Sequence, residues 1–109
     1  MTVLAAHKVD LDVSAAAEFG RIVYAAERYV YGDELGANGE LPQDIEHKLL
    51  CAARRFKPDS DYLLLIGDHV QFVILASMIS KLHGTFLMLR YDRIAKGYIP
   101  VRSLSHSHI

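Results

Sequence analysis

The sequence predicts a small α/β protein with a Rossmann-like sheet, in which a central parallel strand-helix-strand crossover (about residues 61–91) is flanked by antiparallel edge strands. Three observations predict this class. Residues 62–66 form an unbroken apolar run that ends at a Gly-Asp pair, which is typical of a strand buried on both faces. Residues 69–83 fit a helix between a capping aspartate and a terminating glycine. A second strand pattern follows over 85–91, and this order implies a right-handed crossover between parallel strands.

The first third of the chain has shorter signals. Residues 3–6 are apolar and predict the opening strand, and residues 12–19 predict one or two helical turns that are capped by Asp12 and end at the following glycine. Residues 21–31 are rich in β-branched and aromatic side chains, which favour strand. Because Ala26-Glu27-Arg28 can form a tight reversal, both a hairpin and one long bent strand fit this segment.

A loop and an amphipathic helix are expected next. Residues 32–40 contain three glycines and three carboxylates without any periodicity, and they lack the Gly-Lys-Ser/Thr ending of a phosphate loop. Residues 42–57 then place apolar side chains at spacings of three and four, with Pro42 in the first turn and Pro58 after the end. This pattern predicts an amphipathic helix.

The chain closes with an edge strand. Residues 92–97 are polar and predict a turn, and residues 98–102 predict an antiparallel strand. Pro100 favours the edge of the sheet, because proline cannot donate a ladder hydrogen bond. We therefore expect one domain over residues 1–109, with residues 103–109 as a flexible tail.

The helix expected at 69–83 carries more apolar side chains than the single stripe that a surface helix needs. One flank of this helix requires a partner beyond the sheet. Either the helix at 42–57 covers that flank within the chain, or a second subunit does. We expect a homodimer.

Composition excludes several classes. Of 109 residues 51% are hydrophobic and 23% are charged, which is enough for a core and shows no signature of disorder. Twelve Lys and Arg against thirteen Asp and Glu argue against a nucleic-acid-binding surface over the whole molecule. A single cysteine, Cys51, cannot form an intrachain disulfide, and the chain has neither a secretory signal pattern nor a membrane-length apolar run. We expect a cytoplasmic protein that does not enter a membrane.

Candidate ligand-binding residues lie where two parallel strands end. Ligands of parallel sheets collect beyond the carboxyl ends of the strands, where Gly67, Asp68 and His69 are expected, with Asp92 at the end of the neighbouring strand. Two carboxylates there could hold Mg²⁺ or act as a base, although a helix cap and a turn also explain them. The sequence shows no nucleophile-base pair, and His106-x-His108 lacks a third ligand, so we assign no catalytic residue, metal or cofactor.

Basic residues surround the last predicted hairpin. Arg90, Arg93, Lys96 and Arg102 could contact an anion or a nucleic acid. Charged residues at a sheet edge also prevent pairing with other sheets, which is a sufficient structural reason for them.

The segment 61–68, the apolar helix after it, and the segments Tyr91-Asp92-Arg93 and 97–101 together resemble short uncharacterised proteins encoded in bacteriophage genomes. The resemblance covers about residues 42–102. Such proteins carry a helix-starting proline after the Gly-Asp pair, and His69 departs from that pattern. The resemblance implies a small phage accessory protein in the host cytoplasm, and it supplies no catalytic residues.

Our leading hypothesis is a non-catalytic phage accessory protein that acts by protein-protein interaction, as a homodimer, on a host or phage macromolecule. One alternative is a small nucleotide-binding protein or phosphohydrolase with its site at the strand ends. Another is weak nucleic-acid binding through the hairpin at residues 90–102.

Overall fold

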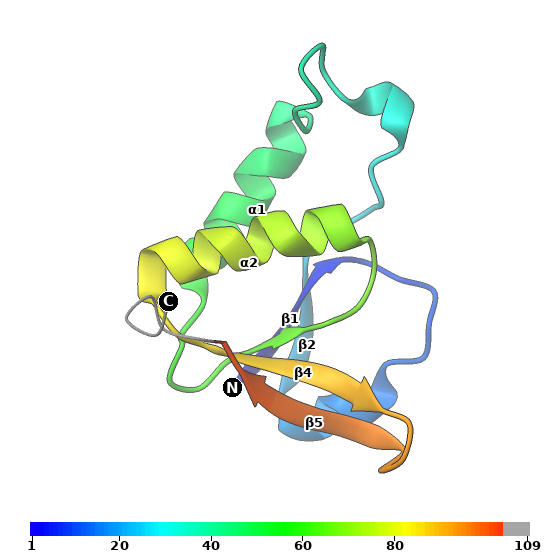
Figure 1. Ribbon diagram of the computed structural model, residues 1–109, viewed down its shortest axis with the longest axis vertical. Coiled ribbons are helices and arrows are strands. Elements are labelled where there is room, and N and C mark those ends of the chain that lie inside the picture. Colours follow the sequence, from blue (N-terminus) through cyan, green and yellow to red (C-terminus); the bar gives the residue numbers. More distant parts are fainter. Residues whose placement is uncertain (104–109) are drawn as a thin grey trace.

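The computed structural model describes residues 1–103, and in this part of the chain the molecule is built on one five-stranded sheet (Figure 1). The strands are β1 (Thr2–His7), β2 (Arg21–Ala26), β3 (Tyr62–Leu64), β4 (Leu87–Asp92) and β5 (Gly97–Arg102). They lie in the order β2-β1-β3-β4-β5, and all neighbours are parallel except β4 and β5. The α/β class, the parallel crossover and the antiparallel edge at β5 are confirmed. The other edge was predicted wrongly, because β2 pairs parallel with β1.

Helices cover the two faces of the sheet unequally. The long helices α1 (Gln43–Arg55) and α2 (His69–His83) share one core with the sheet, and the short 3₁₀ helix η1 (Ser14–Phe19) packs on the opposite face. A second 3₁₀ turn, η2 (Gly32–Glu34), lies in the loop before α1. Among the described residues, neither α1 nor α2 is long and apolar enough to cross a membrane.

Strand β1 is the centre of the molecule. Its side chains alternate between the two cores: Leu4 and Ala6 face the α1-α2 side, and Val3 and Ala5 face η1. All four are buried, because β1 lies between β2 and β3 and is covered on both faces. This explains why the opening strand reads as a short apolar run without polar alternation.

Helix α2 begins and ends where the sequence predicts. The Asp68 carboxylate accepts a hydrogen bond from the backbone N–H of Gln71 at 2.9 Å, which satisfies one of the free donors of the first turn. Gly84 ends the helix with φ of +83°, a conformation that glycine adopts without steric cost.

Residues 21–31 are neither a hairpin nor one long strand, so both interpretations of this segment were wrong. Strand β2 ends at Ala26, and the chain then leaves the sheet. The rings of Tyr29 and Tyr31 pack edge to face with centroids 5.0 Å apart, and the backbone N–H of Val30 donates to a side chain of α2 instead of a strand. Tyr29 and Tyr31, which favoured strand in the sequence, therefore pack against each other outside the sheet.

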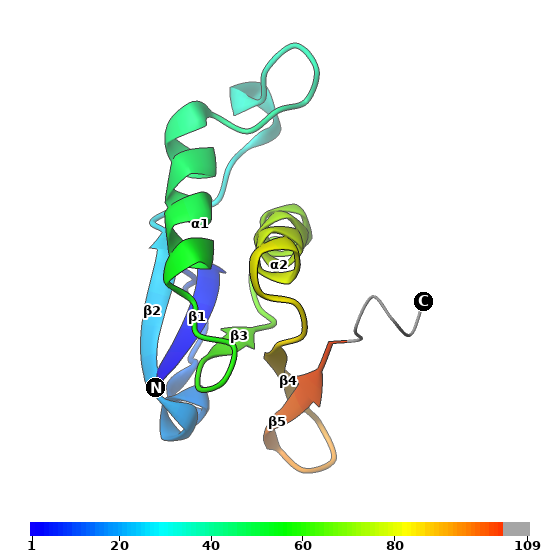
Figure 2. The same ribbon diagram turned by 90° about the vertical axis from the view of Figure 1, so that its left-hand side faces the viewer.

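The two long helices leave half of one sheet face open. Helix α1 packs over β2 and against α2, while α2 packs over β1 (Figure 2). The hairpin of β4 and β5 extends beyond them, so Met88 is only half-buried and Val101 is exposed on that face. The core covers β2, β1 and β3 more completely than β4 and β5.

Ser103 still belongs to the folded part of the chain. Its backbone N–H donates to the carbonyl of Phe86 and its hydroxyl accepts from the N–H of the same residue, both at 2.9 Å. The rest of the expected flexible tail, including His106-x-His108, lies outside the described residues.

Candidate functional site

The predicted residues Gly67 and Asp68 lie between β3 and α2, and His69 is the first residue of α2. All three are beside the end of β1, where the strand order reverses. Gly67 has φ of +91°, and a Cβ added there would lie 2.7 Å from Nε2 of His7. Two independent constraints, backbone conformation and space, therefore require glycine at this position.

His7 joins the ends of β1 and β3. Its ring is buried; Nδ1 donates to the carbonyl oxygen of Lys8 and Nε2 accepts from the N–H of Asp68, both at 2.8 Å. A carbonyl oxygen can only accept, so the imidazole is the neutral tautomer with its hydrogen on Nδ1. Both ring nitrogens are thus occupied by backbone groups, and His7 acts here as a structural bridge.

The start of α2 is closed to anions by its own cap. The Asp68 carboxylate occupies the position that a phosphate would take, and the Asp68 N–H is bonded to His7. A bound phosphate would meet the negative charge of this carboxylate. His69 is exposed beside the cap. This geometry gives no support to a nucleotide site at the strand ends.

Asp92 does not join the residues at the start of α2 through any hydrogen bond of the described chain. Its Oδ2 accepts the N–H of Ala95 at 2.7 Å, which fixes the turn between β4 and β5. Over residues 1–103, no group of three or more His, Cys, Asp or Glu side chains is placed to hold a metal ion. Asp68 and Asp92 each have a local structural role.

The basic residues of the hairpin do not form one surface. Arg90 pairs with Ile99 and Arg102 pairs with Leu87 in the antiparallel register, which places the two arginines on opposite faces of the sheet. Arg93 and Lys96 lie in the connecting turn, where Lys96 has φ of +54°. Of these four basic residues, only Arg93 and Lys96 lie together, in the turn.

Two side chains on the η1 face of the sheet have shifted pKa values. Burial raises the pKa of Tyr98, and the charges of Tyr91 and Asp12 add to this shift. The backbone N–H of Ser14 donates to the Asp12 carboxylate and lowers the pKa of that carboxyl group. Burial of Tyr98 and the hydrogen bonds of Asp12 account for both shifts, which do not mark a proton-transfer site.

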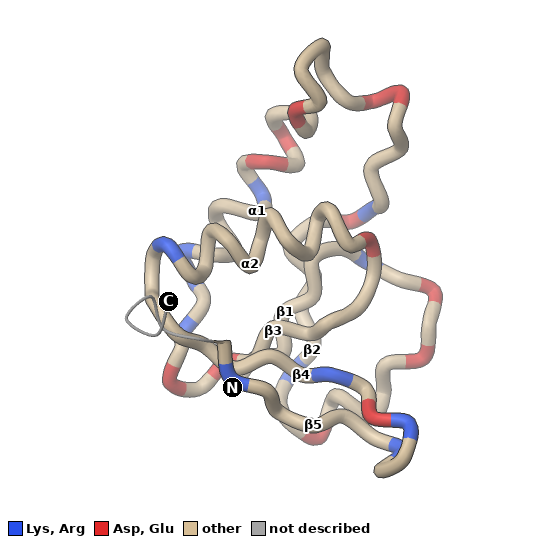
Figure 3. Tube along the Cα trace, viewed as in Figure 1, with Lys and Arg blue, Asp and Glu red and all other residues tan. Residues whose placement is uncertain are grey.

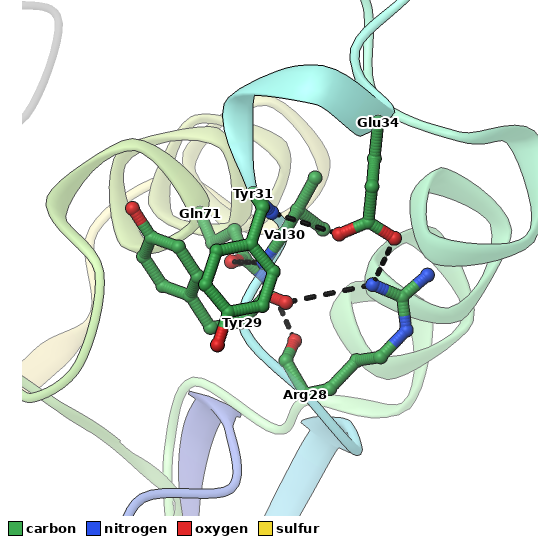
Figure 4. Close-up of polar contacts among 6 residues, drawn as sticks. All are labelled: Arg28, Tyr29, Val30, Tyr31, Glu34 and Gln71. Carbon is green, nitrogen blue, oxygen red and sulfur yellow. Dashed lines mark hydrogen bonds and ion pairs between the residues drawn. The ribbon is translucent and has the colours of Figure 1, made fainter.

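Gln71 forms the most completely buried polar contact of the described chain (Figure 4). Its Oε1 accepts the N–H of Val30 at 2.9 Å, and its Nε2 donates to the carbonyl of Arg28 at 3.3 Å. Arg28 in turn forms an ion pair with Glu34, whose carboxylate also accepts the N–H of Tyr31 at 2.8 Å. Through these contacts α2 holds the segment that follows β2.

A groove of about 1100 Å³ runs between α2 and the open half of the sheet. Val73, Ala76 and Ser77 of α2 form one side, and Phe86 and Met88 form the other. Val73 is 57% exposed and Val70, one turn earlier, is 59% exposed. The flank of α2 opposite α1 is therefore apolar and uncovered by any described residue, as the excess of apolar positions predicted.

Comparison with known proteins identifies the family. A model of the Phage Pam3 gp32-like protein family matches residues 4–104. The chain belongs to this family. This confirms the resemblance to phage-encoded proteins and extends it from residues 42–102 to nearly the whole chain. No curated protein and no solved structure matches the chain.

His7 and Gln71 were not predicted as important residues from the sequence of this phage protein. Each is bonded to residues far along the chain: His7 to Asp68 and Gln71 to residues 28 and 30. The available signals were a histidine that ends an apolar strand and a glutamine within an apolar helix. Neither pattern indicates which distant residue the side chain will bond.

We predict that Gly67→Ala lowers the free energy of unfolding by about 3 kcal/mol, because the new methyl group adds a clash with His7 to an unfavourable φ. Gly84→Ala is the control, since its φ is similar but no atom lies within 4 Å of the added Cβ. We expect that change to cost about 2 kcal/mol, because φ of +83° with ψ of −135° is a conformation that alanine rarely adopts. Urea denaturation measures both, and equal losses would contradict the assigned contact.

We predict that Gln71→Leu costs about 2 kcal/mol, because it leaves the buried N–H of Val30 without an acceptor. Gln43→Leu makes the same chemical change at an exposed position of α1 and should leave the urea midpoint nearly unchanged. In addition, the Val30 amide should exchange faster with solvent in Gln71→Leu. Unchanged exchange there would show that Gln71 does not hold this segment.

Proposed function

We propose that this member of the phage family is a non-catalytic accessory protein that acts by protein-protein interaction in the host cytoplasm, as a homodimer. One observation carries the proposal: the apolar flank of α2 faces an open groove over the uncovered half of the sheet. Such a surface is costly to leave in water, and burial in an assembly removes that cost.

The groove suits a second copy of the same helix. Ala76, Ser77 and Gly84 are small, so the backbone of a partner helix can approach α2 closely along this side. Val70 and Val73 stand at one end of the same flank and supply apolar area. A twofold arrangement, with each α2 lying in the groove of the other chain, would bury these residues in both copies.

The residues at the strand ends also support a non-catalytic role, because their polar groups are already bonded within the protein. The strand ends are bonded internally through His7 and Asp68, and Asp68 and Asp92 have separate structural roles. A dimer would leave α1 and β2 available to a host or phage macromolecule. We therefore place self-association at the α2 groove and any further partner elsewhere.

We predict that light scattering coupled to size exclusion gives a mass near twice the 12.2 kDa of the chain. Val73→Asp should shift the mass to that of one chain, because a carboxylate cannot be buried at an apolar interface without a partner. Ile94→Asp is the matched control, since it makes the same kind of change at a 94% exposed position of the hairpin turn.

Two results would contradict this interface. The unmodified protein could elute as a monomer at high concentration, which would remove self-association altogether. Alternatively, Val73→Asp could remain a dimer with unchanged mass, which would place the contact on another surface. Circular dichroism checks that both variants keep the fold.

A further inference from the structure

A second groove lies on the far side of α1 from α2. It has a volume of about 430 Å³ and is bounded by the edge strand β2 and by α1. Val23 and Ala25 of β2 form its apolar floor, and His47, Cys51 and Arg55 of α1, spaced four residues apart, line its wall. The Sγ atom of Cys51 contacts Nε2 of His47 at 3.4 Å.

The outer side of β2 offers free backbone groups. The N–H of Arg21 donates to the carbonyl of Met1 at 3.2 Å, so Arg21 and Val23 direct their backbone groups toward β1. The alternate residues, Ile22 and Tyr24, direct their N–H and C=O groups away from the sheet. Within the described chain β2 has no neighbour on this side.

This edge lacks the devices that block strand pairing. Strand β5 at the opposite edge carries Pro100, which removes one backbone donor. Strand β2 has the sequence Arg-Ile-Val-Tyr-Ala-Ala, without proline or lysine and with Arg21 as its one charged residue, and it pairs continuously with β1 from Arg21 to Tyr24. An exposed edge of this kind is a template for an added strand.

The groove beside this edge is cationic. Arg21, Lys48 and Arg55 line it and are exposed, and none of them pairs with a carboxylate among residues 1–103. The one acidic residue of the lining, Asp61, has both oxygens bonded to backbone N–H groups, those of Thr2 and Lys57, at 2.9 Å. In Figure 3 acidic residues lie on the loop before α1 and on the first turn of α1, at the end of the helix opposite Arg55.

We propose that the β2 edge binds an extended acidic segment of a partner protein as a sixth strand of the sheet. The segment would pair its backbone with Ile22 and Tyr24. Every second side chain would then point over the groove, where carboxylates meet Arg21, Lys48 and Arg55. This surface is separate from the α2 groove and leaves the proposed dimer intact.

Peptide fits this surface better than single-stranded nucleic acid does. Both are anionic, but a nucleic acid cannot continue the backbone ladder at Ile22 and Tyr24. Binding of single strands also relies on aromatic rings that stack with bases. The tyrosine of β2, Tyr24, also borders the groove, but its ring packs against the core on the η1 face of the sheet and is half-buried there.

The test uses a short fluorescent peptide of alternating glutamate and valine, with fluorescence anisotropy as the readout. A peptide with glutamine in place of glutamate should bind about tenfold more weakly. A glutamate peptide methylated on alternate backbone nitrogens should lose binding, because it cannot complete the ladder. Amide exchange at Ile22 and Tyr24 should slow only with the unmethylated glutamate peptide.

Protein variants locate the binding surface. Arg55→Glu should weaken binding of the glutamate peptide about tenfold. Arg54 is an exposed neighbour outside the groove, so Arg54→Glu should change the affinity by no more than about twofold. The same titrations on Val73→Asp should give unchanged peptide binding. Peptide binding and dimer formation can therefore fail independently.

Three outcomes would overturn the proposal. The first is no saturable binding of the glutamate peptide, or equal binding of its glutamine analogue. The second is full binding of the methylated peptide, which would show that the backbone edge is not used. The third is that an oligothymidine strand binds through Arg55 while the peptide does not, which would assign the groove to nucleic acid.

Discussion

The hydrogen bonds of Gln71 determine how the layers of this molecule are arranged. This side chain is fully buried in the first turn of α2 and bonds both sides of its amide to the chain that leaves β2. A buried amide of this kind is costly unless both its donor and its acceptor are satisfied. The pairing therefore holds the start of α2 near the end of β2, over β1, and away from β4.

The two free surfaces follow from this position of α2. Because α2 lies over β1 and α1 lies over β2, the hairpin of β4 and β5 extends past the helices with one face open. The apolar flank of α2 borders that open face. On the other side, α1 leaves the edge of β2 uncovered and lines it with cations. We propose the first surface for self-association and the second for an acidic partner.

The predictable parts of the fold are those with local signals. Helix α2 was predicted with its bounds because Asp68 and Gly84 mark both ends, and the parallel crossover followed from the apolar run before it. Residues 21–31 were misjudged because strand propensity describes side chains, while the end of β2 depends on a bond from Val30 to Gln71, 41 residues away. His7 was missed for the same reason, since its partner Asp68 is 61 residues away. A hydrogen bond between two polar groups far apart in the chain produces no periodic pattern in the sequence, so it cannot be predicted from one.

The central claim is that two copies meet on the free flank of α2 and the open face of β4 and β5. Backbone hydrogen exchange measured across a dilution series tests it most directly. The account predicts that protection in α2 and in the hairpin of β4 and β5 rises with protein concentration, while protection in β2 and α1 stays constant. Protection that does not change with concentration, or that changes only along β2, would contradict it.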